Sequence, residues 1–176
     1  MSGSLRGKEI VERARKAKQN FGPSYPKKFG GAVAIEILRE ALGEEGIRTS
    51  RRDVYIRGIP SEIDLIIPRT DDKPWLDLLY EPQQVAIALE IKKTGSFGQK
   101  GRDKIRDDFA QLTNAGIGCA YVSLEERQNY KWRPKEMDTA FGYPCFNLAW
   151  HEKDNGPLFQ TDDWERLIAF LRKMIK

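Results

Sequence analysis

Apolar residues recur along the chain with two different periods, which predict helices and strands respectively. Spacings of three and four residues indicate helices at 5–19, 29–42 and 102–114, and a closing helix from residue 162. Short apolar or alternating runs indicate strands at 54–57, 63–68, 84–92, 117–122 and 145–150. The pattern therefore predicts a mixed α/β fold.

The order of these segments narrows the topology. Gly58-Ile59-Pro60-Ser61 joins the first two strands and indicates a hairpin, and a polar stretch at 69–83 separates the second strand from the third. The helix at 102–114 connects the third strand to the fourth. Strand, helix and strand at this spacing predict a crossover that leaves the third and fourth strands parallel.

Positive charge is concentrated at the N-terminal end. The 176 residues have a formal net charge of +4, yet residues 1–28 hold eight basic and two acidic side chains, so the rest is slightly acidic. We expect a basic helix and linker at 1–28 and a single domain at 29–176. The basic block suits a polyanion such as nucleic acid, although a solvated helix face explains it equally well.

Composition excludes several classes of protein. No apolar stretch approaches the ~18 residues of a membrane helix, and the polar start shows no secretory signal, so no membrane partner is expected. Cys119 and Cys145 lie in apolar runs, which indicates buried free thiols in a reducing, cytoplasmic compartment, with a disulfide left open. These cysteines and the lone His151 do not suit tetrahedral zinc, so a metal would have oxygen ligands, which favours magnesium or manganese.

Charged side chains interrupt two apolar runs at positions that strand alternation places on one face. Glu90 and Lys92 project from the side of the third strand opposite its apolar residues, Val85, Ile87, Leu89 and Ile91. By the same alternation, Glu62 and Asp64 share one side of the preceding run. Charges are seldom accepted in such runs unless they meet each other, a metal or a cleft. If the two runs are sheet neighbours, three carboxylates and one ammonium group converge.

The string acid-X-Lys carries no information by itself. It occurs at Asp71-Asp72-Lys73 and at Glu90-Ile91-Lys92, which is about the number that chance provides. Only the second string closes an apolar run, whereas the first lies in a polar turn. This context favours the second as the functional one, with a solvated strand end and an incidental ion pair as the alternative.

Helix, three strands, helix and strand, with an acid on the second strand and Glu-X-Lys on the third, resemble the restriction-endonuclease-like superfamily, also called PD-(D/E)XK nucleases. The resemblance covers roughly residues 29–123. It implies a restriction-endonuclease-like core of order αβββαβ, a mixed central sheet flanked by helices, to which this chain adds N-terminal and C-terminal helices. Ile63 stands before Asp64 where the motif has proline, and many members share this departure.

The resemblance also implies roles for single residues. Asp64 and Glu90 would be metal ligands, the backbone carbonyl of Ile91 a third ligand, and Lys92 the group that orients or deprotonates the attacking water. Two carboxylates suit a hard divalent ion, which lowers the pKa of bound water and neutralises charge in the transition state.

Two further acids are candidates for the metal site. Members of the superfamily often carry an acid on the first helix, which here is Glu36, and a surface position beside Arg39 is equally expected for it. Glu62 would serve a second metal or merely flank the site.

The glycine-rich stretch 93–102 follows the Glu-X-Lys strand and matches neither a P-loop nor a dinucleotide-binding motif. Its basic side chains, Lys93, Lys100 and Arg102, would grip a phosphate near the metal together with backbone amides. An ordinary flexible connection explains the stretch equally well.

Other nucleic-acid contacts are weaker candidates. Gln111 and Lys104 would face the cleft from the helix after the loop, although a solvated helix face is favoured for both. Lys131, Trp132 and Arg133 interleave cations with an aromatic residue in a way suited to stacking on bases, and an exposed turn explains them nearly as well.

The sequence therefore favours a magnesium-dependent or manganese-dependent endonuclease acting on DNA, of restriction, repair or junction-resolving type. Analogy with junction-resolving members raises a homodimer as one assembly. The alternative is a non-catalytic nucleic-acid-binding or assembly module of the same fold, against which the joint presence of Asp64, Glu90 and Lys92 argues. A histidine-dependent hydrolase would need His151, which has no nucleophile motif near it.

Overall fold

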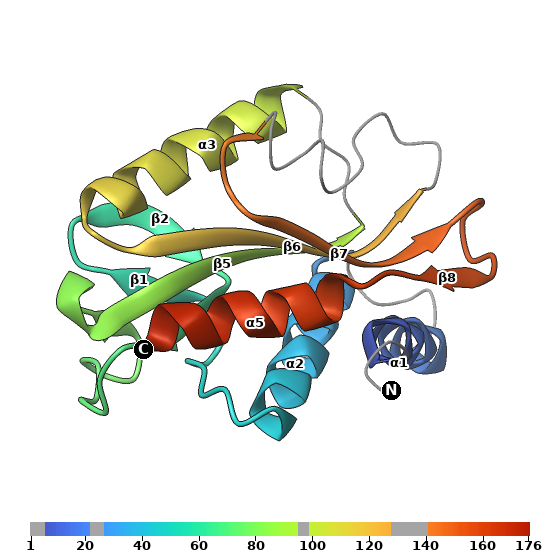
Figure 1. Ribbon diagram of the computed structural model, residues 1–176, viewed down its shortest axis with the longest axis horizontal. Helices are drawn as coiled ribbons and strands as arrows, with labels where there is room; N and C mark the ends of the chain where they lie inside the picture. Colours follow the sequence, from blue (N-terminus) through green and yellow to red (C-terminus); the bar gives the residue numbers. More distant parts are fainter. Residues whose placement is uncertain (1–5, 22–26, 95–98, 128–140) are drawn as a thin grey trace.

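The structure is a computed structural model that describes residues 6–21, 27–94, 99–127 and 141–176 (Figure 1). Its main helices and strands follow one another in the order that the sequence pattern predicts, with three short elements in addition. The helices are α1 (Arg6–Phe21), α2 (Lys27–Glu44), the 3-10 turn η2 (Pro82–Gln84), α3 (Gln99–Asn114) and α5 (Asp163–Ile175). The strands are β1 (Val54–Ile56), β2 (Ile59–Ile63), β3 (Leu65–Pro68), β4 (Leu79–Tyr80), β5 (Val85–Thr94), β6 (Gly118–Arg127), β7 (Cys145–His151) and β8 (Leu158–Gln160).

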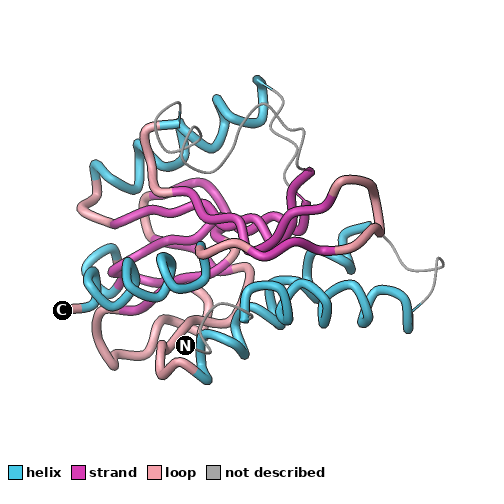
Figure 2. Tube along the Cα trace, turned by 45° about the vertical axis from the view of Figure 1, so that its right-hand side comes forward, coloured by secondary structure: helices cyan, strands magenta, loops and turns pink. Residues whose placement is uncertain are grey.

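The larger sheet has the strand order β3-β5-β6-β7-β8. Its centre is parallel, because β5 pairs with β6 and β6 with β7 in the same direction, while β3 and β8 pair antiparallel at the two edges. Figure 1 shows α3 on one face of this sheet and α1, α2 and α5 on the other, and Figure 2 shows helices on both sides of the strand layer. The predicted mixed fold and the parallel pair joined by α3 are confirmed.

One predicted strand is wrong in its bounds, and this changes the geometry around Asp64. The run 63–68 is not one strand, because β2 ends at Ile63 and belongs to the smaller sheet β2-β1-β4, whereas β3 begins at Leu65 in the larger sheet. The hairpin turn is correspondingly shorter than predicted, with Gly58 at φ 83°, a conformation that glycine adopts without steric cost. The chain therefore bends at Asp64 as it passes from one sheet to the other.

Two apolar cores lie on the two faces of the larger sheet. The core under α1, α2 and α5 contains Ile87, Leu89 and Ile91, and the core under α3 contains Ala88 and Val85. Simple alternation placed Val85 with Ile87. That prediction is wrong because the pairing of β3 with β5 shifts by one residue between Ile67 and Pro68, which turns Val85 to the other face.

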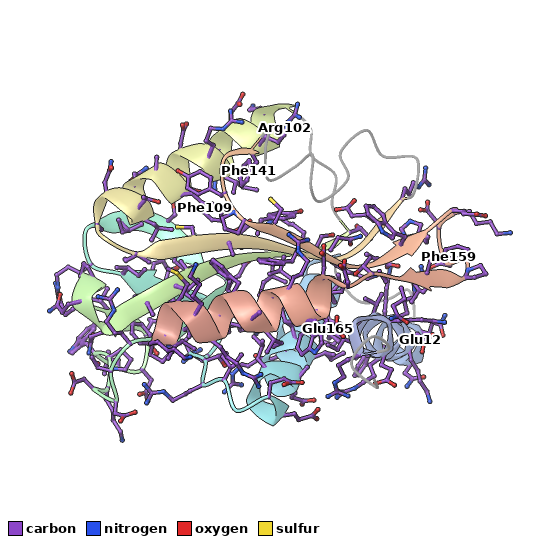
Figure 3. All side chains as sticks on the ribbon, viewed as in Figure 1. Glu12, Arg102, Phe109, Phe141, Phe159 and Glu165 are labelled. Carbon is purple, nitrogen blue, oxygen red and sulfur yellow. The ribbon has the colours of Figure 1, made fainter. Side chains whose placement is uncertain are left out.

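The α3 face is sealed by aromatic side chains. Phe109 of α3 lies next to Phe141, as Figure 3 shows, with ring centroids 5.8 Å apart in an edge-to-face arrangement. Tyr121 of β6 is fully buried beneath them. On the opposite face, α5 buries the stripe that the sequence predicts, namely Trp164, Leu167, Ile168 and Leu171.

The basic helix α1 packs into the main core. Ile10, Val11 and Ala14 are buried there, and each fully buried Ile or Val side chain contributes about 1.5–3 kcal/mol. Gly7 permits this close approach, because a Cβ at that position would stand 2.9 Å from the backbone oxygen of Leu148. The polar face of α1 remains exposed, so its basic side chains, among them Arg13, Lys16 and Lys18, lie at the surface.

The two cysteines are free and buried, as predicted for unpaired thiols. Burial raises the pKa of the Cys119 thiol to about 12, so the thiol stays protonated at neutral pH. Across residues 6–21, 27–94, 99–127 and 141–176, no helix combines the length and the apolar character that a bilayer crossing requires.

Candidate active site

Asp64 lies at the bend between the two sheets, opposite Glu90. The pairing of β3 with β5 places Leu65 opposite Leu89, so the next residues outward, Asp64 and Glu90, face each other across the two strands. Backbone pairing stops here because the chain turns away. One carboxylate oxygen of Asp64, Oδ2, instead accepts a hydrogen bond of 2.7 Å from the backbone N–H of Ile91. Asp64 is thereby fixed against β5.

Glu90 and Lys92 project from the same face of β5, as alternation predicts. The Lys92 ammonium donates a hydrogen bond to Oε1 of Glu90. The Glu90 side chain is 23% exposed and that of Lys92 is 44% exposed. Their neighbours on β6 are Tyr121 and Ser123. The cluster of Asp64, Glu90 and Lys92 is thus held by adjacent strands and is still open to solvent.

The electrostatics of this cluster favour a bound cation. Burial, together with the Glu90 carboxylate, raises the pKa of Asp64 to about 7, although the Ile91 hydrogen bond and Lys92 oppose the shift. Burial lowers the pKa of Lys92, but the Glu90 and Asp64 carboxylates outweigh it and leave this pKa above its usual value. The positive charge of one ammonium group therefore does not balance the negative charges of two half-buried carboxylates.

The donor set fits a hard divalent ion. Oδ2 of Asp64 is held by Ile91, so Oδ1 is the oxygen that can face an ion, and Lys92 likewise leaves Oε2 of Glu90. In a strand, the N–H and C=O groups of one residue point to the same edge, so the Ile91 carbonyl also faces the side of Asp64. Among the described residues, no group of three Asp, Glu, His or Cys side chains could hold a metal. The available set is two carboxylates and one carbonyl.

Asp53, a third acid beside Asp64 and Glu90, was not predicted from the sequence. The backbone N–H of Asp53 donates to the backbone oxygen of Asp64 at 3.2 Å, and its charge contributes to the raised pKa of Asp64. Asp53 has a φ of 56°, a left-handed conformation that Asp tolerates better than most residues. An acid just before a short strand gives no sequence signal, because only the β1–β2 hairpin brings it to Asp64.

Glu36 lies on the surface of α2 rather than in the cluster. Its side chain is 41% exposed and pairs with Arg39 at 3.1 Å and Arg52 at 3.8 Å. This is the surface alternative that the sequence left open. Arg52 also contacts the Asp53 carboxylate, so Glu36 reaches the cluster only through an intervening cation.

Glu62 is exposed on β2, where the Tyr55 hydroxyl donates to its Oε2 at 2.8 Å. Alternation grouped Glu62 with Asp64 as if one strand ran through both, but β2 ends at Ile63 and belongs to a different sheet from β3, which begins after Asp64. The charges that raise the pKa of Asp64 are those of Glu90 and Asp53.

The basic residues of the expected phosphate-binding stretch do not lie together on one face of the sheet. Lys93 lies near Lys18 and Arg15 of α1, on the face opposite Lys92, and burial together with Lys18 lowers its pKa. Lys100 is exposed and Arg102 is partly buried at the start of α3. Residues 95–98 lie outside the described part of the chain.

The remaining nucleic-acid candidates receive little support from their positions. Gln111 is exposed on α3, and Lys104 is exposed there and pairs with Asp108 at 3.1 Å. Both positions agree with the solvated helix face that the sequence favours. Lys131, Trp132 and Arg133 lie outside the described residues.

His151 is buried at the end of β7 in a separate polar group. Its Nδ1 lies 3.5 Å from a carboxylate oxygen of Glu125, which also accepts a hydrogen bond of 2.8 Å from Arg15. A histidine held in this way, with 3% exposure, does not face solvent where a substrate could reach it. This arrangement argues against a histidine-dependent hydrolase.

Comparison with known proteins gives a structural likeness only. No protein-family model and no curated protein matches the sequence. The cAAA-bound form of NucC from P. aeruginosa ATCC27853 has 14% sequence identity and a TM-score of 0.63, over 96% of this chain and 88% of that chain. The cAAA-bound form of E. coli MS115-1 NucC has 14% identity and a TM-score of 0.61 over the same shares.

The apo form of E. coli MS115-1 NucC matches less closely, with 13% identity and a TM-score of 0.52 over 94% of this chain and 89% of that chain. These likenesses extend over nearly the whole of both chains. The chain therefore has a mixed α/β fold similar to that of NucC.

Proposed function

We propose that this protein is a divalent-metal-dependent nuclease that hydrolyses phosphodiester bonds in DNA, with Asp64, Glu90 and Lys92 at its centre. The observation that carries the proposal is that Asp64 and Glu90 lie opposite each other where β3 pairs with β5. Asp64 is hydrogen-bonded to the backbone N–H of Ile91, and Lys92 is hydrogen-bonded to Glu90. The likeness to NucC supports a nuclease of the restriction-endonuclease-like fold.

Each residue has a task that follows from its position. Asp64 and Glu90 would each offer one oxygen to Mg²⁺ or Mn²⁺, and the Ile91 carbonyl would be the third protein ligand. When bound, the ion supplies Lewis-acid activation of water and neutralises charge on the phosphoryl group. Lys92 is held protonated by Glu90 and Asp64, so it suits orienting a water and stabilising negative charge better than removing a proton.

The backbone hydrogen bond to Asp64 is important for this arrangement. A carboxylate on a free side chain samples several rotamers, whereas the Ile91 N–H holds Oδ2 of Asp64 in place by a hydrogen bond of 2.7 Å. Ligands fixed before the ion arrives lose less conformational entropy when it binds. The bend at Asp64 therefore connects the two sheets and also positions a proposed metal ligand.

The proposal is tested by cleavage of labelled duplex DNA, single-stranded DNA, branched DNA and RNA with Mg²⁺, Mn²⁺ or EDTA. Two of the similar NucC structures are cAAA-bound, so each reaction is run with and without cAAA to allow for a protein that needs a nucleotide ligand. We expect metal-dependent DNA cleavage that Asp64→Asn and Glu90→Gln abolish. Glu62→Gln is the control, because Glu62 is exposed on the other sheet.

Two outcomes would contradict the nuclease proposal. Cleavage that survives in Asp64→Asn and Glu90→Gln would show that another site carries it. No cleavage of any substrate under any of these conditions, combined with strongly salt-dependent DNA binding, would favour the non-catalytic binding module instead. Size measurement of the same preparation decides between a monomer and the homodimer that analogy suggests.

A further inference from the structure

A groove separates α1 from α2, the two helices that Figure 1 shows on the face of the sheet opposite α3. Its volume is about 520 Å³, within the range of about 300–1,000 Å³ that is usual for sites that hold a small molecule or one residue of a polymer. The apolar part of its lining consists of partly exposed side chains from both helices, namely Ala17, Phe29, Ala32, Val33 and Ile37. We call this feature the α1–α2 groove.

The charged part of the lining has a surplus of positive charge. Three cations, Arg13, Lys16 and Arg52, share the groove with two acids, Glu36 and Glu40. Both acids are engaged, because Glu40 accepts a hydrogen bond of 2.7 Å from Arg13 and Glu36 lies 3.8 Å from Arg52. Lys16 is exposed and forms no ion pair within the part of the chain that the structure describes. The groove therefore suits an anionic ligand that has an apolar portion.

One end of the α1–α2 groove borders the candidate active site. Arg52 lines the groove and also contacts the Asp53 carboxylate. The backbone N–H of Asp53 in turn donates to the backbone oxygen of Asp64 at 3.2 Å. A single residue therefore separates the groove from a proposed metal ligand, and a nucleic-acid strand bound at Asp64 would pass close to the groove.

The apolar lining distinguishes between forms of nucleic acid. A duplex presents phosphates and the edges of its base pairs, and its base faces are hidden by stacking. An unpaired base exposes its faces, which stack on aromatic side chains while nearby cations contact the backbone. The Phe29 ring is supported for such a contact, because it lies edge-to-face against Phe21 with ring centroids 4.9 Å apart.

We propose that the α1–α2 groove binds one unpaired nucleotide of the DNA strand that is cleaved, with its base against Phe29 and Val33 and its phosphate beside Lys16. The proposal rests on the proposed function for the identity of the ligand, and it deepens that function by naming a substrate class. The preferred substrate would carry an unpaired segment beside the scissile bond. The basic helix α1 would thereby take part in substrate selection.

The test measures the affinity of labelled single-stranded DNA and of blunt duplex DNA at several salt concentrations in EDTA, where a metal-dependent enzyme does not cut. Ala32→Met fills part of the groove without changing its charge, and Lys16→Gln removes one cation. The matched controls are on α5, which does not line the groove. Ala169→Met fills a different groove of about 570 Å³, and Lys173→Gln removes a charge from an exposed position.

Ala32→Met is expected to lower the affinity for single-stranded DNA by about fivefold or more, the smallest loss usual for one stacked base. Its affinity for blunt duplex should stay within about twofold of the parent. Lys16→Gln should lower the slope of log affinity against log salt by roughly 0.7, the value for one phosphate contact on a single strand. Both controls should keep the parent values, and both groove variants should melt within about 2 °C of the parent.

Four outcomes would overturn the proposal. Ala32→Met would bind single-stranded DNA as tightly as Ala169→Met does, or it would lose single-stranded and duplex affinity equally. Lys16→Gln would keep the salt slope of Lys173→Gln, which decides the matter even if methionine at position 32 disturbs folding. In a separate titration of the free mononucleotide dAMP, a loss confined to dAMP would assign the groove to a small ligand. Since binding is measured without cleavage, a protein that cuts DNA and shows any of these outcomes refutes the groove site and leaves the nuclease proposal standing.

Discussion

Replacing Lys92 with methionine is expected to reduce metal-dependent DNA cleavage by about 10²–10³-fold, the range for removing one group that stabilises negative charge in the transition state. Methionine keeps the length of the apolar stem and removes the ammonium group. Lys92 has no place among the proposed metal ligands, so the variant should still bind Mn²⁺. The measurement is the single-turnover cleavage rate at saturating DNA, with Mn²⁺ affinity determined by calorimetry on the same preparation.

The chain provides a matched control in its other acid-X-Lys string, Asp71-Asp72-Lys73. Lys73→Met makes the same chemical change at an exposed position outside the cluster, and it should leave the cleavage rate within about twofold of the parent. Equal rates in Lys92→Met and the parent would remove Lys92 from the catalytic centre. Loss of Mn²⁺ affinity in Lys92→Met would mean that the lysine holds the ligands in place, which contradicts the role given to it here.

The second large effect is a loss of stability of the metal-free protein as pH rises. The pKa of Asp64 in the folded protein is about 7, above its usual value of 3.8, mainly because the side chain is buried. Folding therefore favours the protonated form, so this contribution to stability is complete below about pH 4 and is lost as pH rises through 7. The loss amounts to up to about 4 kcal/mol. Asp64→Asn, which cannot ionise, should avoid it.

Thermal unfolding at pH 5 and pH 8 measures this effect. In EDTA at pH 8, Asp64→Asn should melt up to roughly 8–16 °C above the parent, and at pH 5 the difference should shrink. Mg²⁺ should raise the Tm of the parent at pH 8, because an ion at 100 times its Kd adds about 2.7 kcal/mol to the free energy of unfolding. The Tm of Asp64→Asn should stay nearly unchanged, because this variant lacks one of the two proposed carboxylate ligands. Asp71→Asn is the control, since the Asp71 side chain is 98% exposed. If the parent proved as stable as Asp64→Asn at pH 8 in EDTA, the raised pKa of Asp64 in the folded protein would be refuted.

The sequence could predict those parts of the site that depend on one strand or on strand order. Alternation along β5 correctly places Glu90 and Lys92 on one face, and the neighbouring position of β3 is confirmed by its antiparallel pairing with β5. The parallel pair formed by β5 and β6 is likewise confirmed. These features follow from local periodicity and chain connection, which a single sequence contains.

The parts that could not be predicted depend on where the chain bends. Alternation was carried through Asp64 as if the strand continued, and it therefore grouped Glu62 with the cluster although β2 and β3 belong to different sheets. The same bend brings Asp53 to Asp64 from a hairpin partner that gives no local signal. Lys93 was expected to grip a phosphate near the metal together with Lys100 and Arg102, whereas the charges that act on it are those of Lys18, Glu125 and Arg15.

The most direct test of the central claim is an anomalous difference map from crystals of the parent protein soaked in Mn²⁺. The account predicts one peak within coordination distance of Asp64, Glu90 and the Ile91 carbonyl, and no such peak in Asp64→Asn crystals treated in the same way. A parent map without density between these oxygens, or with its strongest peak elsewhere, would contradict the account.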